Sequence, residues 1–158
     1  KSLGNCIYLS DTAKEIQKKV NSMFTDPEHL QITDPGHVEG NVVFTYLDAF
    51  SNDGHFAKYL PEYANLDEMK DHYRRGGLGD GTCKKFLFNI MEEFLQPMRE
   101  RRKQYEQNIP QVYEILRKGS EAARAEAAKT LADVRKAMKI DYFDDADLIA
   151  EHTKKYQG

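Results

Sequence analysis

The sequence predicts an all-α protein, a helical bundle of five to seven helices around one long central helix. Three observations favour this fold class. Apolar residues recur at helical spacing in several segments, and clusters of glycine, proline and other turn formers separate those segments. No pair of segments alternates apolar and polar residues as two partnered strands would. With 158 residues, 40% of them hydrophobic, the chain is long enough to bury a core.

The first predicted helix follows Ser10 and Asp11, whose side chains are common helix N-caps. Apolar residues then follow at the i, i+4, i+7 and i+8 spacing of one helix face: Ile16, Val20, Met23 and Phe24. We expect this helix to end near Asp26, because the residue before a proline avoids helical backbone angles.

Two more helices are predicted from their capping residues. Asn41 can cap a helix over residues 42–50; the stretch VVFTY within it also contains strand formers, but no second strand is available, so we predict a helix. Asn65 begins a short helix with acidic residues in its first turn, Arg74 and Arg75 in its last turn, and Gly76 just past its end. Each of these charges complements the helix dipole.

The central helix is predicted to start near Thr82, after a glycine-rich segment at 76–81. Its apolar residues cover about half the helix circumference at 100° per residue: Phe86, Leu87, Ile90, Met91, Phe94, Leu95 and Met98. The glycine-rich segment follows a helix instead of a strand and lacks the Gly-Lys-Ser/Thr ending of a phosphate loop. We therefore interpret it as a hinge.

Pro110 is expected to open the next helix, with Val112, Ile115 and Leu116 facing inward and Gly119 as its C-terminal stop. Ser120 would then cap a separate helix with one apolar face: Ala123, Ala127, Leu131, Val134 and Met138. Beyond Ile140 the acidic segment is expected to form one or two further helical turns.

Composition excludes several functions. The formal net charge of −3 argues against binding nucleic acid through bulk electrostatics. Cys6 and Cys83 are too few for a disulfide framework or a zinc site, and the five histidines never pair at metal-ligand spacing, so we expect no metal site. No apolar run approaches the ~18 residues of a membrane span, and no signal peptide is evident. A cytoplasmic protein is expected.

A local basic run remains as a candidate site. Within residues 99–103 only Glu100 interrupts the basic residues, and Arg99, Arg102 and Lys103 share one helix face because they lie at i, i+3 and i+4. Such a run is either a solvated helix end or a patch that contacts RNA phosphates. The residues alone leave both readings open.

Several segments together resemble the C-terminal third of bacterial tryptophanyl-tRNA synthetases. The first two residues, Lys1 and Ser2, resemble the end of the KMSKS loop of class I aminoacyl-tRNA synthetases. The other matching segments are residues 11–20 (DTAKEIQKKV), 34–41 (DPGHVEGN), 43–50 (VFTYLDAF), 97–102 (PMRERR), 115–124 (ILRKGSEAAR) and 134–138 (VRKAM). Tyrosyl-tRNA synthetases are the nearest confusable family.

This resemblance implies a parent ligase that uses ATP and magnesium to activate tryptophan and then charges tryptophan tRNA. It assigns residues 1–10 to a remnant of the catalytic loop, with Lys1 and Ser2 binding ATP, and residues 11–140 to a helical domain that binds the tRNA anticodon region. Residues 141–158 form an acidic tail without an assigned role. Arg99, Arg102 and Lys103 become candidate tRNA contacts.

The same resemblance implies that the parent is a homodimeric cytoplasmic enzyme whose N-terminal nucleotide-binding fold is missing here. We therefore expect no complete set of catalytic residues, no bound cofactor and no catalysis by this chain alone. The alternatives are a non-enzymatic helical module that binds protein, or a piece of a tyrosyl-tRNA synthetase.

Overall fold

A computed structural model describes residues 6–157 of the chain. Over this range it contains helices and no strands, which confirms the all-α prediction: α1 (Ala13–Asn21), α2 (Val42–Phe50), α3 (Asp53–Tyr59), α4 (Leu66–Arg75), α5 (Asp80–Glu106), α6 (Ile109–Ala137) and α7 (Ala146–Tyr156). The chain divides into two units, residues 1–104 and 105–158. None of the helices in residues 6–157 is both long enough and apolar enough to cross a bilayer.

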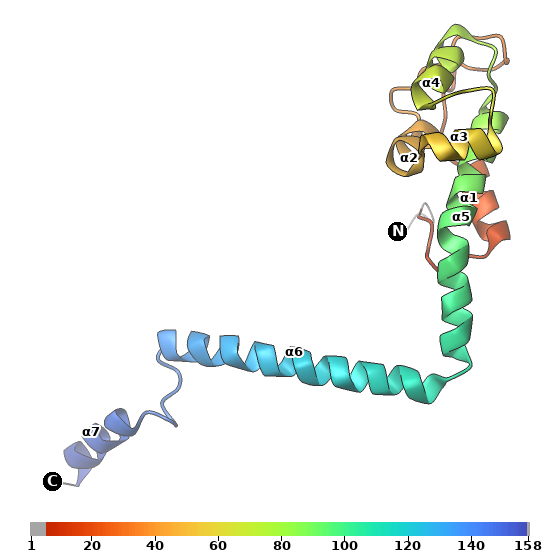
Figure 1. The fold of residues 1–158 in the computed structure, drawn as a ribbon. Coiled ribbons are helices and arrows are strands. Elements are labelled where there is room, and N and C mark those ends of the chain that lie inside the picture. Colours follow the sequence, from red (N-terminus) through yellow and green to blue (C-terminus); the bar gives the residue numbers. More distant parts are fainter. Residues whose placement is uncertain (1–5, 158) are drawn as a thin grey trace. The chain divides into compact units, whose positions relative to one another are not determined.

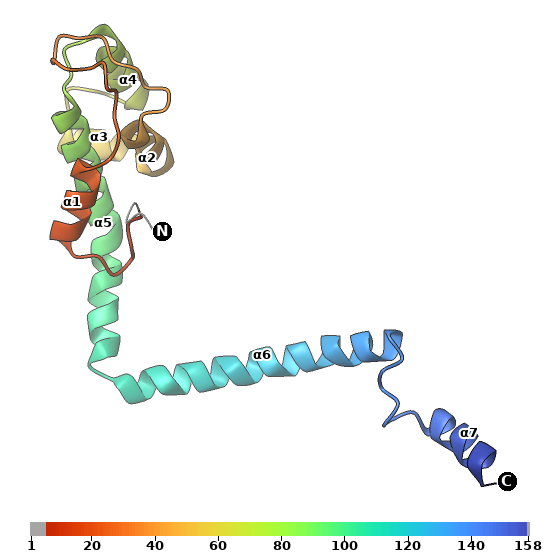
Figure 2. The same cartoon turned by 180° about the vertical axis from the view of Figure 1, so that it is seen from behind.

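The core of the first unit forms around α5, as predicted for the central helix. Figures 1 and 2 show α1 beside α5 and the helices α2, α3 and α4 grouped around its N-terminal half. The side chains that α5 buries there are Cys83, Phe86, Leu87, Ile90, Met91 and Leu95. Phe94, which was predicted to face inward, is 47% exposed, while Met98 packs partly against the core.

The first helix is shorter than predicted at both ends. Thr12, instead of Ser10 or Asp11, is its N-cap and forms a reciprocal capping box with Glu15. The helix ends at Asn21, several residues before Asp26, because the Ser22 hydroxyl donates to the Lys19 carbonyl at 2.9 Å and closes the last turn locally. Phe24 lies outside the helix and is 60% exposed, so it does not belong to the predicted apolar face.

The two helices predicted from asparagine caps are confirmed. The Asn41 side chain accepts from the Val43 amide at 3.0 Å, and the Asn65 side chain accepts from the Glu68 amide at 3.0 Å. The short helix α3, whose cap is Asn52, was not predicted from the sequence. Residues 52–54 resemble a turn in the sequence, but they include the start signal of this helix, because Asn52 and His55 form another capping box.

The glycine-rich segment is shorter than predicted, because α5 already begins at Asp80 instead of near Thr82. Gly76 and Gly77 have φ angles of 81° and 112°, which side-chain-bearing residues rarely adopt. The Gly77 amide donates to the Ile32 carbonyl at 2.5 Å. This contact holds the connection between α4 and α5 against the loop that precedes α2.

The prediction of two helices over residues 110–138 is wrong. Residues 109–137 form one helix, α6, that passes through Gly119 and Ser120. A glycine inside a helix costs only about 1 kcal/mol relative to alanine, and the surrounding Ala, Glu, Arg and Lys residues are strong helix formers. Ile115 and Leu116, predicted to face inward, are 51% and 58% exposed. In the acidic tail, α7 has 11 residues and is longer than the one or two turns expected.

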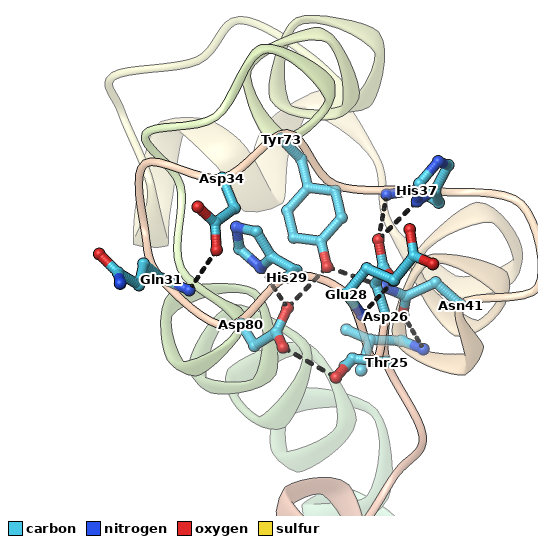
Figure 3. A network of polar contacts seen from close by, with 11 residues as sticks. Thr25, Asp26, Glu28, His29, Gln31, Asp34, His37, Asn41, Tyr73 and Asp80 are labelled. Carbon is cyan, nitrogen blue, oxygen red and sulfur yellow. Dashed lines mark hydrogen bonds and ion pairs between the residues drawn. The ribbon is translucent and has the colours of Figure 1, made fainter.

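A largely buried polar network joins the loop before α2 to the start of α5 (Figure 3). One carboxylate oxygen of Asp80 accepts from the Tyr73 hydroxyl at 2.7 Å, and the other accepts from the Thr25 hydroxyl at 2.8 Å. Burial, and then the hydrogen bond to Asp80, raises the pKa of Tyr73, so its hydroxyl remains a donor at neutral pH. The network fixes the 22–41 loop on the helical core.

A second carboxylate, Asp26, closes the same loop. It accepts from the backbone amides of Glu28 and His37, at 2.9 and 2.7 Å, and lies 2.8 Å from Nδ1 of the His37 ring. These two amides and the ring hold the pKa of Asp26 below its ordinary value. The hydrogen bond to Asp26 raises the pKa of His37 above its ordinary 6.5.

These two shifts predict opposite pH dependences of stability. The raised pKa of His37 contributes stability that is complete below 6.5 and is lost as pH rises through the higher folded-state value. We expect the difference in free energy of unfolding between wild type and His37→Ala to be largest below pH 6.5 and to shrink as pH rises through the folded-state pKa of His37. Urea unfolding across this range measures it. Asp26→Asn should abolish the pH-dependent part, and a difference independent of pH would contradict the assignment.

The lowered pKa of Asp26 affects stability at low pH. The contribution of Asp26 to stability is complete above the ordinary pKa of a carboxyl group, and it is lost as pH falls through the lower folded-state pKa. The loop is therefore most firmly held between these two limits, where Asp26 is ionised and His37 is protonated.

Candidate nucleic-acid interface

The predicted basic side chains lie on the C-terminal part of α5, beyond Leu95, the last residue that this helix buries. The helix is continuous from Asp80 to Glu106, so Arg99, Arg102 and Lys103 share one face as expected. Arg102 and Lys103 are exposed, whereas Arg99 is half-buried. Two cations are thus presented to solvent where a phosphate backbone could approach them.

The guanidinium of Arg99 contacts the protein on both sides. Nη2 donates to Oε2 of Glu92 at 2.6 Å, and Nη1 donates to the backbone carbonyl of Asp11 at 3.4 Å. Glu92 lies two helical turns before Arg99 on α5, but Asp11 precedes it by 88 residues. Arg99 therefore bridges α5 and the segment that leads into α1.

That segment forms a closed turn over Tyr8–Asp11. The Asp11 amide donates to the Tyr8 carbonyl at 3.0 Å, and the Tyr8 amide donates back to the Asp11 carboxylate at 2.8 Å. Lys19 of α1 pairs with the same carboxylate and lies 4.5 Å from the centroid of the Tyr8 ring. Burial alone would raise the pKa of Asp11, but the hydrogen bonds from Lys19 and the Tyr8 amide outweigh it and lower the pKa.

Four charged side chains meet where α5, α1 and the Tyr8–Asp11 turn come together, and all four are mostly shielded from water. Lys19 and Asp11 are 23% and 8% exposed, and Arg99 and Glu92 are 16% and 21% exposed. We call these four residues the Arg99 cluster. The second carboxylate oxygen of Glu92 is buried and finds no hydrogen-bond partner among the described residues.

The remaining predicted site residues stand apart from this geometry. Lys1 and Ser2 lie outside the described residues. Cys83 is buried, which raises the pKa of its thiol to about 12 and leaves it protonated at neutral pH, and Cys6 is half-buried. Within residues 6–157, no group of three or more His, Cys, Asp or Glu residues is placed to hold a metal ion.

The contacts of Arg99 were not predicted from the sequence. A signal for its pairing with Glu92 exists, since residues seven apart lie on the same helix face. No local pattern identifies Asp11, because its carbonyl meets Arg99 only after α1 has packed against α5.

Comparisons with known proteins give a consistent result. The family model for tRNA synthetases class I (W and Y) matches residues 1–96. The tryptophan–tRNA ligase of Clostridium longisporum is 53% identical over 145 residues, which are 92% of this chain and 40% of that protein. The tryptophan–tRNA ligase of Streptococcus pyogenes serotype M1 is 50% identical over 143 residues, again 40% of its length. The chain thus spans about 40% of the length of these curated relatives.

A solved structure supports the fold. The tryptophanyl-tRNA synthetase of Campylobacter jejuni matches 87% of this chain and 41% of its own chain, with a TM-score of 0.64 and 22% sequence identity. A second crystal structure of that enzyme, in complex with ADP and tryptophan, matches with a TM-score of 0.65 and 22% identity. At this identity the likeness concerns the fold.

Proposed function

Because the chain belongs to the class I tRNA synthetases of the tryptophan and tyrosine group, we propose that it is the helical, tRNA-binding part of a tryptophan–tRNA ligase. The names of the relatives favour tryptophan over tyrosine, although the family model covers both. They also disfavour the alternative of a non-enzymatic helical module. Because this sequence spans only part of those relatives, the activity belongs to the whole enzyme.

The observation that carries tRNA binding is the exposure of Arg102 and Lys103 at the end of α5. A helix that presents two cations beyond its buried stretch can contact successive phosphates of an RNA backbone. Contacts of this kind position RNA without reading its sequence. We therefore assign Arg102 and Lys103 to contacts with the RNA backbone. Arg99 belongs to the same basic run.

The proposal extends to the substrates and partners of the whole ligase. It acts on ATP with magnesium, tryptophan and tryptophan tRNA, as a homodimer in the cytoplasm. Lys1 and Ser2 belong to its ATP-binding loop. A positive charge at such a loop lowers the barrier when it meets the negative charge that develops on the triphosphate. The nucleotide-binding fold lies in the part of the ligase outside this sequence.

The proposal predicts salt-dependent binding of tryptophan tRNA that Arg102→Ala weakens. Each phosphate contact releases counterions, so the logarithm of affinity falls linearly with the logarithm of salt concentration. We expect Arg102→Ala, and separately Lys103→Ala, to lower affinity and to reduce the salt slope by about one. Titration of the labelled tRNA at two or more salt concentrations measures both quantities.

Lys58→Ala is the matched control, because it removes one positive charge from α3 and leaves the basic run intact. It should keep the wild-type slope. If the tRNA does not bind at low salt, or binds without salt dependence, the tRNA-binding proposal fails and the protein-interaction module becomes the better reading. If Lys58→Ala has the same effect as Arg102→Ala, the contact is with overall charge and not with this helix end.

A further inference from the structure

We propose that Phe94 of α5 is a platform on which an unstacked base of the bound tRNA stacks. This inference deepens the proposed function and rests on it. It adds a contact with an RNA base to the contacts with the RNA backbone that Arg102 and Lys103 provide.

Phe94 is the exposed end of a row of three aromatic rings that runs from α2 to α5. A single exposed apolar residue is ordinary on a protein surface, but a supported row is not. The rings of Tyr46 and Phe50 stack on α2, with centroids 6.0 Å apart and planes at 28°. The Phe50 ring lies 5.5 Å from that of Phe94, with the planes at 58°. Tyr46 and Phe50 also pack partly against the core, so the row is anchored there.

The row holds the Phe94 ring while leaving much of it accessible. Met91 and Leu95, its neighbours on the same helix, are 4% and 2% exposed, whereas Phe94 is 47% exposed. Its contact with Phe50 restricts the ring before any ligand arrives, and a preorganised side chain loses little conformational freedom on binding. Phe94 therefore offers a fixed aromatic surface to a partner.

The acidic residues beside Phe94 do not oppose an RNA partner. Glu92 is paired within the Arg99 cluster. Glu93 accepts from the ammonium group of Lys58 at 3.0 Å. Because each carboxylate already has a cation next to it, it repels an approaching phosphate less than a lone carboxylate would.

Exposed arginines continue the same side of α5 beyond Phe94. Residues seven apart lie on one helix face, so Arg101 is nearly in line with Phe94, about 10 Å further along the axis. Arg102 follows directly and is also exposed. Glu100 lies six residues after Phe94 and therefore on a different face. Proteins that bind unpaired nucleotides combine such parts, since cations contact the phosphates and aromatic rings stack on the bases. This charge complementarity favours RNA as the partner.

The first test is the affinity of the 158-residue chain for labelled tryptophan tRNA. We expect Phe94→Ala to lower the affinity about tenfold, because one base loses its stacking partner. The salt slope should keep its wild-type value, because no charge is removed. Phe94→Leu keeps apolar bulk without a ring and should recover little, whereas Phe94→Tyr should bind as the wild type does.

Phe24→Ala is the matched control. It makes the same chemical change at a phenylalanine that is 60% exposed in the 22–41 loop, away from the basic run. The affinity for tryptophan tRNA should not change in this variant. Circular dichroism of each variant confirms that the helices are retained.

A fluorescence measurement tests stacking directly. The chain contains no tryptophan, so Phe94→Trp introduces a single indole whose emission a stacked base quenches. We expect tryptophan tRNA to quench this emission and to leave the emission of Phe24→Trp unchanged.

Four results would each overturn the inference. These are wild-type affinity in Phe94→Ala, wild-type affinity in Phe94→Leu, a reduced salt slope in Phe94→Ala, or an unquenched indole in Phe94→Trp. The first would assign the exposed ring to a contact with protein, and the third would trace the loss to displaced cations. Failure of the proposed function would instead appear in the unsubstituted chain, as absence of salt-dependent binding of the tRNA.

Discussion

Replacing Phe86 with alanine is expected to lower the free energy of unfolding by about 3–5 kcal/mol. Phe86 is 2% exposed, and its ring lies 4.6 Å from that of Phe56, centroid to centroid. The substitution removes this aromatic pair and leaves a cavity where α3 packs on α5. Domains of this size have a total stability of about 5–15 kcal/mol, so the loss is a large share of the whole.

Urea unfolding followed by circular dichroism measures the effect. Phe94→Ala is the matched control, because it makes the same chemical change on the same helix at a side chain that is 47% exposed. Phe94 retains one ring contact, with Phe50 at 5.5 Å, so its loss should cost about 1 kcal/mol or less. Equal losses for the two variants would contradict the assignment of α5 as the central core helix.

Local signals predicted those parts of the fold whose causes are local. Asn41 and Asn65 start α2 and α4 because their side chains bond an amide two or three residues ahead. The apolar face of α5 follows from spacing alone. The same kind of signal misled at Gly119 and Ser120, where a glycine and a good cap residue predicted a helix boundary. There the summed helix propensity of the flanking residues outweighs one unfavourable residue.

Tertiary contacts determine what the sequence did not reveal. The basic run at 99–103 could be located from the sequence, but its division into a half-buried Arg99 and exposed Arg102 and Lys103 could not. That division depends on a carbonyl 88 residues away and on the packing of α1 beside α5. Likewise, the three-way binding of Asp80 by Tyr73, Thr25 and His29 joins segments that no periodicity relates.

Gly76→Ala is expected to destabilise the first unit by about 3 kcal/mol or more, from two separate causes. The φ and ψ angles of Gly76 are 81° and 154°, a region that only glycine adopts without strain. A Cβ atom built there would also lie 2.3 Å from the carbonyl oxygen of Thr33. Because that neighbour is backbone in the loop fixed by Asp26 and Asp80, it cannot move aside as a flexible side chain would.

The matched control, Gly81→Ala, is expected to change stability in the opposite direction. Gly81 lies in the first turn of α5, and a Cβ there would meet nothing within 4 Å. Gly81→Ala should therefore stabilise the protein by about 0.5–1 kcal/mol, since alanine loses less conformational entropy in a helix. Chemical denaturation of both variants measures the pair. A small effect of Gly76→Ala would mean that the connection between α4 and α5 can move away from residues 32–34, as the hinge interpretation of the glycine-rich segment requires. A large effect would mean that the close backbone approach at Thr33 fixes it.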